Sequence, residues 1–154
     1  MTYADNTSVS VEKSRGEIER TLGRYGATAF GYMTEAGRAV IMFEAHERRI
    51  RFDLPLPRPD ERRFTHTPGK GIARTAAQAQ AEWEQGCRQR WRALALAVKA
   101  KLEAVEAGIA EFEDEFLAYI ALPNGQTMSE MARPAIARAY DTGTMPALMP
   151  GVQP

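Results

Sequence analysis

The stretch Gln80–Leu122 reads QAEWEQGCRQRWRALALAVKAKLEAVEAGIAEFEDEFLAYIAL, and it decides the fold. Its apolar side chains recur at steps of three or four, from position 83 to position 120. That spacing predicts one long helix with a continuous buried face. About 40 residues at about 1.5 Å rise per residue would span roughly 60 Å, more than the diameter of a compact domain of this size. We therefore expect this helix to reach beyond its own fold, toward another subunit or a long ligand.

The elements before this helix predict a small sheet. Ser14 and Glu17 have the spacing of a capping box, which predicts a short helix with Ser14 as its N-cap. Residues 27–34, 38–45 and 49–54 then alternate in the manner of strands, with tight turns between them. We expect one face of the resulting meander to pack on the long helix. The other face, which carries Arg49 and Arg51, should meet solvent.

These patterns predict a single α+β domain. Its order is a short helix, a three-stranded antiparallel meander, a basic loop, one long helix, a short C-terminal helix and an extended tail. Residues 1–13 are expected to be a flexible N-terminus, 14–143 the domain and 144–154 an apolar tail that docks on its own subunit or a neighbour. Thr127 and Glu130 form a second capping box, which predicts a helix to about Asp141.

Composition is that of an ordinary globular protein, with 154 residues of which 44% are hydrophobic and 26% charged. No apolar run approaches the ~18 residues that would cross a membrane. The N-terminus lacks the basic and apolar regions of a secretory signal. One cysteine, Cys87, excludes a disulfide framework and lies on the apolar stripe as a core residue would. We expect a cytoplasmic protein without a membrane partner.

The formal net charge of zero hides an asymmetry. Residues 1–101 hold 18 bases and 12 acids, a net charge of +6, whereas residues 102–154 hold 2 bases and 8 acids, a net charge of −6. A basic body with an acidic end can bind a polyanion, or it can join other copies head to tail. Solvated surface charge without a partner is the plain alternative.

The basic residues before the long helix concentrate in the segment 58–80, which has no periodicity and is interpreted as a mobile basic loop. Arginines bind phosphates, and an aromatic side chain can stack on an unpaired base. The predicted nucleic-acid-binding residues come from the last hairpin, this loop and one side of the long helix: Arg48, Arg49, Arg51, Arg62, Arg63, Phe64, Lys70, Arg74, Arg88, Arg92 and Lys99. Trp83 and Trp91 are interpreted first as core or subunit-interface residues and second as stacking platforms.

Catalytic and metal-binding patterns are weak by comparison. Neither histidine has metal-ligand spacing from a cysteine or a carboxylate pair, and the common phosphate-binding and nucleophile motifs are absent from the sequence. On a continuous helix, Glu111, Asp114 and Glu115 would share one face, as a divalent-metal site of a nuclease would need. A solvated helix face explains the same run. No cofactor or metal is expected, and an enzyme is the weaker interpretation.

Two families resemble this order of elements. A helix, a three-stranded meander and a helix are also the order of the double-stranded-RNA-binding domain. That family has a Gly-Pro-x-His type loop between its first strands, where this chain has Glu35-Ala-Gly-Arg38, and a lysine cluster that opens its second helix. In this chain the basic cluster lies far into the long helix. The chain therefore departs from both motifs of that family.

Residues 14–122 also resemble the core of the phage single-strand annealing proteins of the Red-beta, Erf and Sak class. The resemblance implies a basic groove for single-stranded nucleic acid, assembly into rings or filaments, and no metal, nucleotide or covalent chemistry. The segment 88–105 is in addition similar to that of small uncharacterised phage and prophage proteins.

The sequence hypothesis is therefore a protein that binds single-stranded DNA or RNA and anneals it in phage-type recombination or replication, as a homo-oligomer larger than a dimer. The alternative is a small phage structural or regulatory assembly protein without a nucleic-acid role. A metal-dependent nuclease at Glu111, Asp114 and Glu115 is the third.

Overall fold

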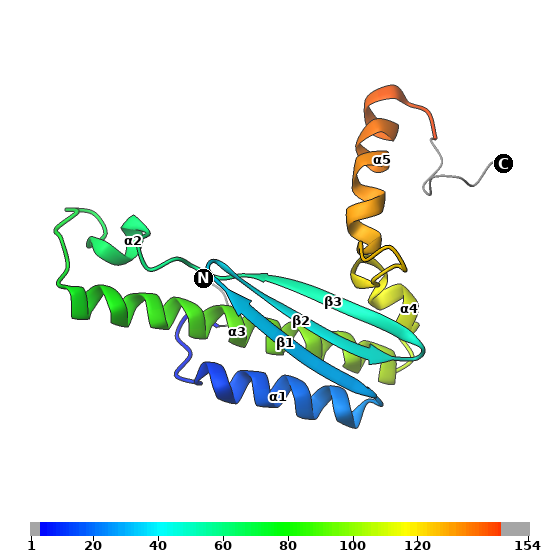
Figure 1. Cartoon of the computed structure of the whole chain (residues 1–154), viewed down its shortest axis with the longest axis horizontal. Coiled ribbons are helices and arrows are strands. Elements are labelled where there is room, and N and C mark those ends of the chain that lie inside the picture. The colour runs from blue at the N-terminus through cyan, green and yellow to red at the C-terminus, as the bar shows by residue number, and fades with distance from the viewer. Residues whose placement is uncertain (1–3, 146–154) are drawn as a thin grey trace.

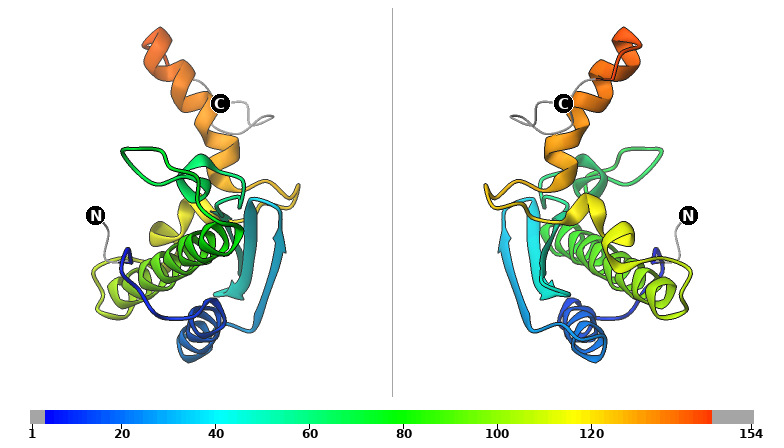
Figure 2. Two further views of the ribbon diagram at one scale, coloured as in Figure 1. Left: turned by 90° about the vertical axis from the view of Figure 1, so that its left-hand side faces the viewer. Right: turned by 90° about the vertical axis from the view of Figure 1, so that its right-hand side faces the viewer.

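The computed structural model describes residues 4–145 and confirms the α+β class. The elements in chain order are α1 (Val11–Arg24), β1 (Ala29–Glu35), β2 (Arg38–Ala45), β3 (Arg48–Pro55), α2 (Arg62–Thr65), α3 (Ala76–Glu106), α4 (Phe112–Glu115), the 3-10 turn η1 (Leu117–Tyr119) and α5 (Met128–Thr142). The antiparallel sheet has the order β1-β2-β3, and α1 and α3 lie side by side on one of its faces (Figures 1 and 2). Within residues 4–145 no helix is long and apolar enough to cross a membrane.

Strands β2 and β3 have one buried and one open face, as the alternation predicts, whereas β1 is mostly exposed on both faces. On β2, Ile41 and Phe43 are fully buried, and they pair with Phe52 and Ile50 of β3. These side chains form the core together with Trp91, Val98 and Leu102 of α3 and with Ile18 and Leu22 of α1. Arg49 lies on the opposite, open face.

The long helix is shorter than its apolar stripe predicts. It ends at Glu106 after 31 residues, which is a length of roughly 46 Å. Gly108 takes φ +75°, its N–H donates to the Val105 carbonyl, and the Ile109 N–H donates to the Ala104 carbonyl. These two bonds make a Schellman motif, which ends a helix at a left-handed glycine. The prediction of a continuous helix to Leu122 is therefore wrong.

The chain reverses direction after Gly108, and this reversal covers the rest of the stripe. Ile109, at the turn, is 82% exposed, whereas Phe112 and Phe116 of the following segment are buried against the sheet. The Phe116 ring meets that of Phe43 edge-on, with 5.8 Å between centroids. Ile120 forms an antiparallel bridge with Ile50. Apart from Ile109, the apolar residues of the stripe after Glu106 are thus covered within the chain, and the shorter helix no longer predicts by its length that another subunit lies beyond it.

The first helix begins one turn before the predicted cap. Ser10 is the N-cap, and its Oγ accepts a hydrogen bond from the Lys13 N–H at 3.1 Å. Ser14 is instead a buried helical residue whose hydroxyl has no hydrogen-bond partner among the described residues. Residues 11–13 of the expected flexible N-terminus are thus helical. The amides of Gln85 and Gln89 also hold the preceding segment on α3 through the Asp5 carbonyl.

The basic loop has an internal structure that the sequence did not predict. It contains α2 and an isolated bridge between His66 and Ala73, and it ends at Thr75, the N-cap of α3, rather than at Gln80. The Arg74 Nη1 donates to the carbonyls of Arg63, Phe64 and His66 at 2.9, 3.2 and 3.0 Å. One guanidinium therefore fixes the path of this loop. Its mobility stays a prediction.

The C-terminal helix confirms its predicted cap. The Thr127 Oγ1 accepts from the Glu130 N–H at 3.2 Å, and Gly143 ends the helix in a left-handed conformation. Figure 1 shows that α5 projects from the body, and within the described residues it packs mainly on η1. The predicted docking of the tail concerns residues 144–154, of which 146–154 lie outside the described residues.

Candidate nucleic-acid interface

The eleven predicted binding residues lie in three separate places. The loop that bears Arg62 and Lys70 is at one end of the molecule and the β2–β3 turn, next to Arg48, is at the other (Figure 1). Arg92, on α3, is paired with α1 on the helical side of the sheet. One continuous groove made of all eleven residues is therefore not present in the described structure.

The arginines of the last hairpin are occupied by acidic partners. Arg48 Nε lies 3.1 Å from Glu113 Oε1, and the Arg49 guanidinium binds Glu44 with both Nε and Nη2. Arg51 pairs with Glu130 and donates to the Gly125 carbonyl at 2.7 Å. Arg51 ties β3 to α5 and the turn before it, Arg48 ties it to α4, and Arg49 pairs across the sheet with β2, so all three have a structural role.

The basic residues of α3 divide in the same way. Arg92 bonds to Glu17 of α1, and this bond lowers the pKa of the Glu17 carboxylate, with a smaller contribution from Lys99. Arg88 Nε donates to the neutral Gln85 at 2.8 Å. Lys99 is exposed. Only Arg92 of these three is neutralised by an ion pair within residues 4–145.

The loop also contains cations without an ion pair. Arg58, Arg62 and Lys70 are exposed and make no salt bridge within residues 4–145. The Arg58 N–H and the Arg63 guanidinium bond to Glu61 and lower the pKa of its carboxylate, and Arg90 of α3 is close enough to lower it further. We call Arg58, Arg62, Lys70 and Arg90 the loop cluster.

Phe64 is not a stacking platform, which corrects its predicted role. It is 5% exposed and packs on α3 at Gly86, where an added Cβ would lie 3.1 Å from the Phe64 ring and 3.2 Å from Pro57. A glycine inside α3 thus makes room for this ring. The Arg63 guanidinium carbon lies 4.5 Å from the centroid of the Phe64 ring, so a neighbouring loop residue already covers the ring where a base would stack.

The acidic run is also arranged differently from the expectation. Glu111 is the N-cap of the four-residue α4, and Glu115 pairs with Lys101 at 3.3 Å. No group of three or more histidine, cysteine or acidic side chains among residues 4–145 is arranged to hold a metal ion. The structure does not assemble the nuclease site that a continuous helix would have made.

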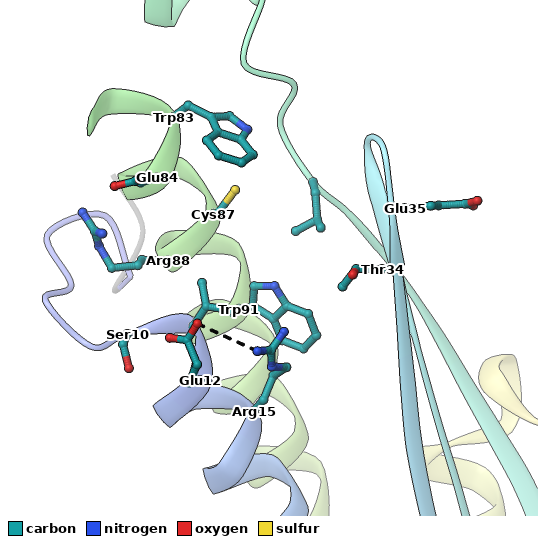
Figure 3. A pocket seen from close by; sticks show the side chains of 12 residues that line it. Ser10, Glu12, Arg15, Thr34, Glu35, Trp83, Glu84, Cys87, Arg88 and Trp91 are labelled. Carbon is teal, nitrogen blue, oxygen red and sulfur yellow. Dashed lines mark ion pairs between the residues drawn. The ribbon is translucent and has the colours of Figure 1, made fainter. Parts of the chain in front are cut away.

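A pocket that the sequence did not predict opens between the start of α1, the middle of α3 and the end of β1 (Figure 3). Its volume is about 500 Å³. Trp83, Cys87 and Trp91 form one wall, at successive steps of four along α3. Burial raises the pKa of the Cys87 thiol, with a further contribution from Glu84. The spacing of Trp83 and Trp91 in the sequence indicates that both lie on one face of the helix, but it does not predict a pocket beside them.

Arg15 of α1 closes the lower side of this pocket (Figure 3). Its guanidinium carbon lies 5.4 Å from the Trp91 ring centroid and 4.5 Å from that of Tyr32, and Nη2 lies 4.0 Å from Glu12 Oε1. Such cation–π contacts stabilise both partners. The pocket therefore combines aromatic walls with charged groups of both signs.

Compared with protein-family models, curated proteins and solved structures, the chain matches none of them. The fold and the surface define its class. It is an α+β domain with two helices on one face of a three-stranded meander, a basic loop at one end and a projecting helix at the other.

Proposed function

We propose that the protein binds nucleic acid through the loop cluster. The observation that carries this proposal is where the unpaired cations gather. Arg48, Arg49, Arg51 and Arg92 are each neutralised by a carboxylate. Several exposed cations make no salt bridge within residues 4–145, and three of them, Arg58, Arg62 and Lys70, belong to one loop, with Arg90 of α3 close to its Glu61. A phosphate backbone attracts cations that have no competing acidic partner.

The loop supplies phosphate contacts without exposed aromatic rings, since Phe64 is buried. Binding by the loop alone should thus be independent of sequence and steeply dependent on salt. Annealing of complementary single strands by an oligomer extends the same proposal, as the resemblance to the annealing proteins implies. It requires no cofactor.

The experiment is fluorescence anisotropy with labelled single- and double-stranded oligonucleotides at several salt concentrations. A variant with Arg58, Arg62, Lys70 and Arg90 changed to alanine should lose affinity for all sequences alike. The slope of log affinity against log salt should flatten by about 0.7 for each single-strand phosphate contact removed.

The matched control changes Lys13, Arg24, Arg133 and Arg138 to alanine, because these exposed residues of α1 and α5 remove the same charge elsewhere. The control should retain most of the affinity. Equal losses in the two variants would mean that net charge alone attracts the oligonucleotide, and the loop proposal would then be abandoned.

Self-assembly is the second candidate, and α5 is the observation that favours it. Tyr140 and Met145 are 88% and 87% exposed, and Ile136 is about half exposed. With Ala135 and Ala139 they line an apolar groove of about 370 Å³ along the projecting helix. An apolar helix face of this kind packs well on another helix. We propose a second copy of the chain as its partner.

A further inference from the structure

We infer that the pocket beside Trp83 and Trp91 receives an unpaired base of a single strand whose phosphates lie on the loop cluster. This inference rests on the proposed function and adds to it a strand preference and a site for the base. The walls, the rim and the position of the pocket each support it.

The walls suit a flat, weakly polar ring. The Trp83 indole N–H donates to the Pro57 carbonyl at 2.8 Å, so the only polar atom of this ring is satisfied and its faces are apolar. Trp83 is only partly buried and offers the accessible ring face, whereas Trp91, 2% exposed and held from α1 by Arg15, belongs to the core and forms the floor of the pocket. Leu56 and Val11 add apolar surface. Aromatic side chains recognise bases by stacking on them.

The rim suits a neutral heterocycle better than an anion. Glu12, Glu35 and Glu84 all line the pocket and would repel a phosphate. Glu12 and Glu35 have arginine partners, Arg15 and Arg38, and Glu84 accepts from Gln80 at 3.1 Å. Arg88 is bonded to a neutral amide. Hydrogen-bond donors (arginine) and acceptors (glutamate) therefore both line the aromatic pocket. This combination suits the hydrogen-bonding edge of a base, which also carries donors and acceptors.

The volume of about 500 Å³ falls within the range of small-molecule sites, about 300–1,000 Å³. It leaves room for a base together with its sugar.

The pocket is continuous with the start of the loop. Leu56 lines the pocket, Pro57 bonds to Trp83, and Arg58 is the first residue of the loop cluster. The Arg58 side chain reaches back to Gly37, two residues after Glu35 of the pocket rim. A strand with phosphates on the loop can therefore place one base in the pocket. Because a base stacked in a duplex cannot enter, the pocket selects single strands.

The test compares the affinity of the full chain for two single-stranded oligonucleotides of equal length, one normal and one with abasic sites throughout its centre. Both present the same phosphates to the loop. The normal strand should bind about tenfold more tightly, as expected for one stacked base, and should quench tryptophan fluorescence more strongly.

A pocket-filling variant, Cys87→Phe, should bind the normal strand only as tightly as wild type binds the abasic one. The matched control, Leu96→Phe, enlarges an exposed side chain of the same helix and should behave as wild type. Circular dichroism checks that both variants are folded.

The outcomes separate this inference from the proposed function. Equal, salt-dependent binding of the two strands by wild type would overturn the base pocket while leaving phosphate binding by the loop intact. This comparison needs no variant, so it stands even if Cys87→Phe does not fold. Absence of binding to either strand would overturn both. Retention of the tenfold preference in a folded Cys87→Phe would place the base elsewhere and overturn the inference.

Discussion

Two adjacent residues of the β2–β3 turn have a left-handed backbone although neither is a glycine. His46 has φ 52° and Glu47 has φ 60°. Two-residue hairpin turns of this geometry favour asparagine and glycine, because a Cβ is crowded in the left-handed region. The His46 ring compensates by stacking on Phe112, with 4.4 Å between centroids. The turn is therefore stabilised by a tertiary contact rather than by its own sequence.

Replacement of Glu47 by glycine should therefore stabilise the fold by about 0.5–1 kcal/mol, since it removes left-handed strain at some cost in chain entropy. Urea unfolding measures this change. Ala36→Gly, in the other hairpin turn, is the control, because Ala36 is not left-handed and should lose stability instead. A destabilised Glu47→Gly variant would show that the glutamate side chain matters more than the backbone.

The ion pair between Glu17 and Arg92 leads to a prediction about pH. In the folded protein the Glu17 carboxylate has a pKa below the ordinary value of 4.5. The stability that the ion pair contributes is therefore fully present above pH 4.5 and is lost as pH falls through the lowered pKa. Since the Glu17 side chain is 38% exposed, the pair should contribute less than about 1 kcal/mol.

Glu17→Gln should accordingly unfold more easily than wild type at pH 7, and the difference should shrink below pH 4.5. Thermal unfolding over a pH series measures it. Glu19→Gln, an exposed neighbour on α1 without an ion pair among the described residues, is the control. A difference that stays constant with pH would show that the carboxylate charge of Glu17 is not the cause.

At the scale of elements, the end of α3 is the feature that shapes the molecule. Gly108 allows the Schellman motif, and the reversal brings Phe112 and Phe116 back over the sheet. Gly108→Ala should destabilise the protein by about 1 kcal/mol, because alanine is strained at φ +75°. Gly23→Ala is the matched control.

Gly23 lies inside α1 with ordinary helical φ and with open space where a Cβ would stand, so alanine should stabilise there by about 0.5–1 kcal/mol. Chemical denaturation of the pair compares the two glycines directly. If Gly108→Ala left the free energy of unfolding unchanged or raised it, as Gly23→Ala should, then α3 could continue past Glu106 without loss of stability.

Much of this element order could be predicted from the sequence, because alternation and capping are local signals. Strand β2 has the predicted bounds, and Thr127 is the predicted cap of α5. The break at Gly108 was not predicted because the apolar spacing of three or four continues across it. Such spacing does not distinguish one long helix from two helical segments joined by a chain reversal. A glycine at position 108 was the one local indication that the helix could end there.

The candidate site could be predicted less well, for a physical reason. Whether an arginine is available for a phosphate depends on acids that are distant in sequence, such as Glu113 for Arg48 and Glu130 for Arg51. No local pattern contains those pairings. The loop residues Arg62 and Lys70 were predicted, whereas Arg58 and Arg90 were not among the predicted binding residues, although both lie in basic stretches of the sequence.

At the scale of the whole molecule, α5 leads to a prediction about assembly. If its apolar groove receives a second copy, the wild-type chain should sediment as an oligomer at tens of micromolar, while Tyr140→Glu should weaken self-association at least tenfold through the cost of burying a charge. Arg138→Glu, on the opposite side of α5, should keep the assembly. A monomeric wild type would contradict both the groove and the predicted oligomer.

The reversal after Gly108 also has a consequence for synthesis on the ribosome. Ile50 and Phe43 are made early, but their covering partners Phe116 and Ile120 emerge only after the whole of α3. Until then one end of the sheet exposes apolar surface, the kind of intermediate that chaperones bind and that aggregates when it accumulates. The nascent chain should therefore become resistant to protease only once residue 120 has left the exit tunnel.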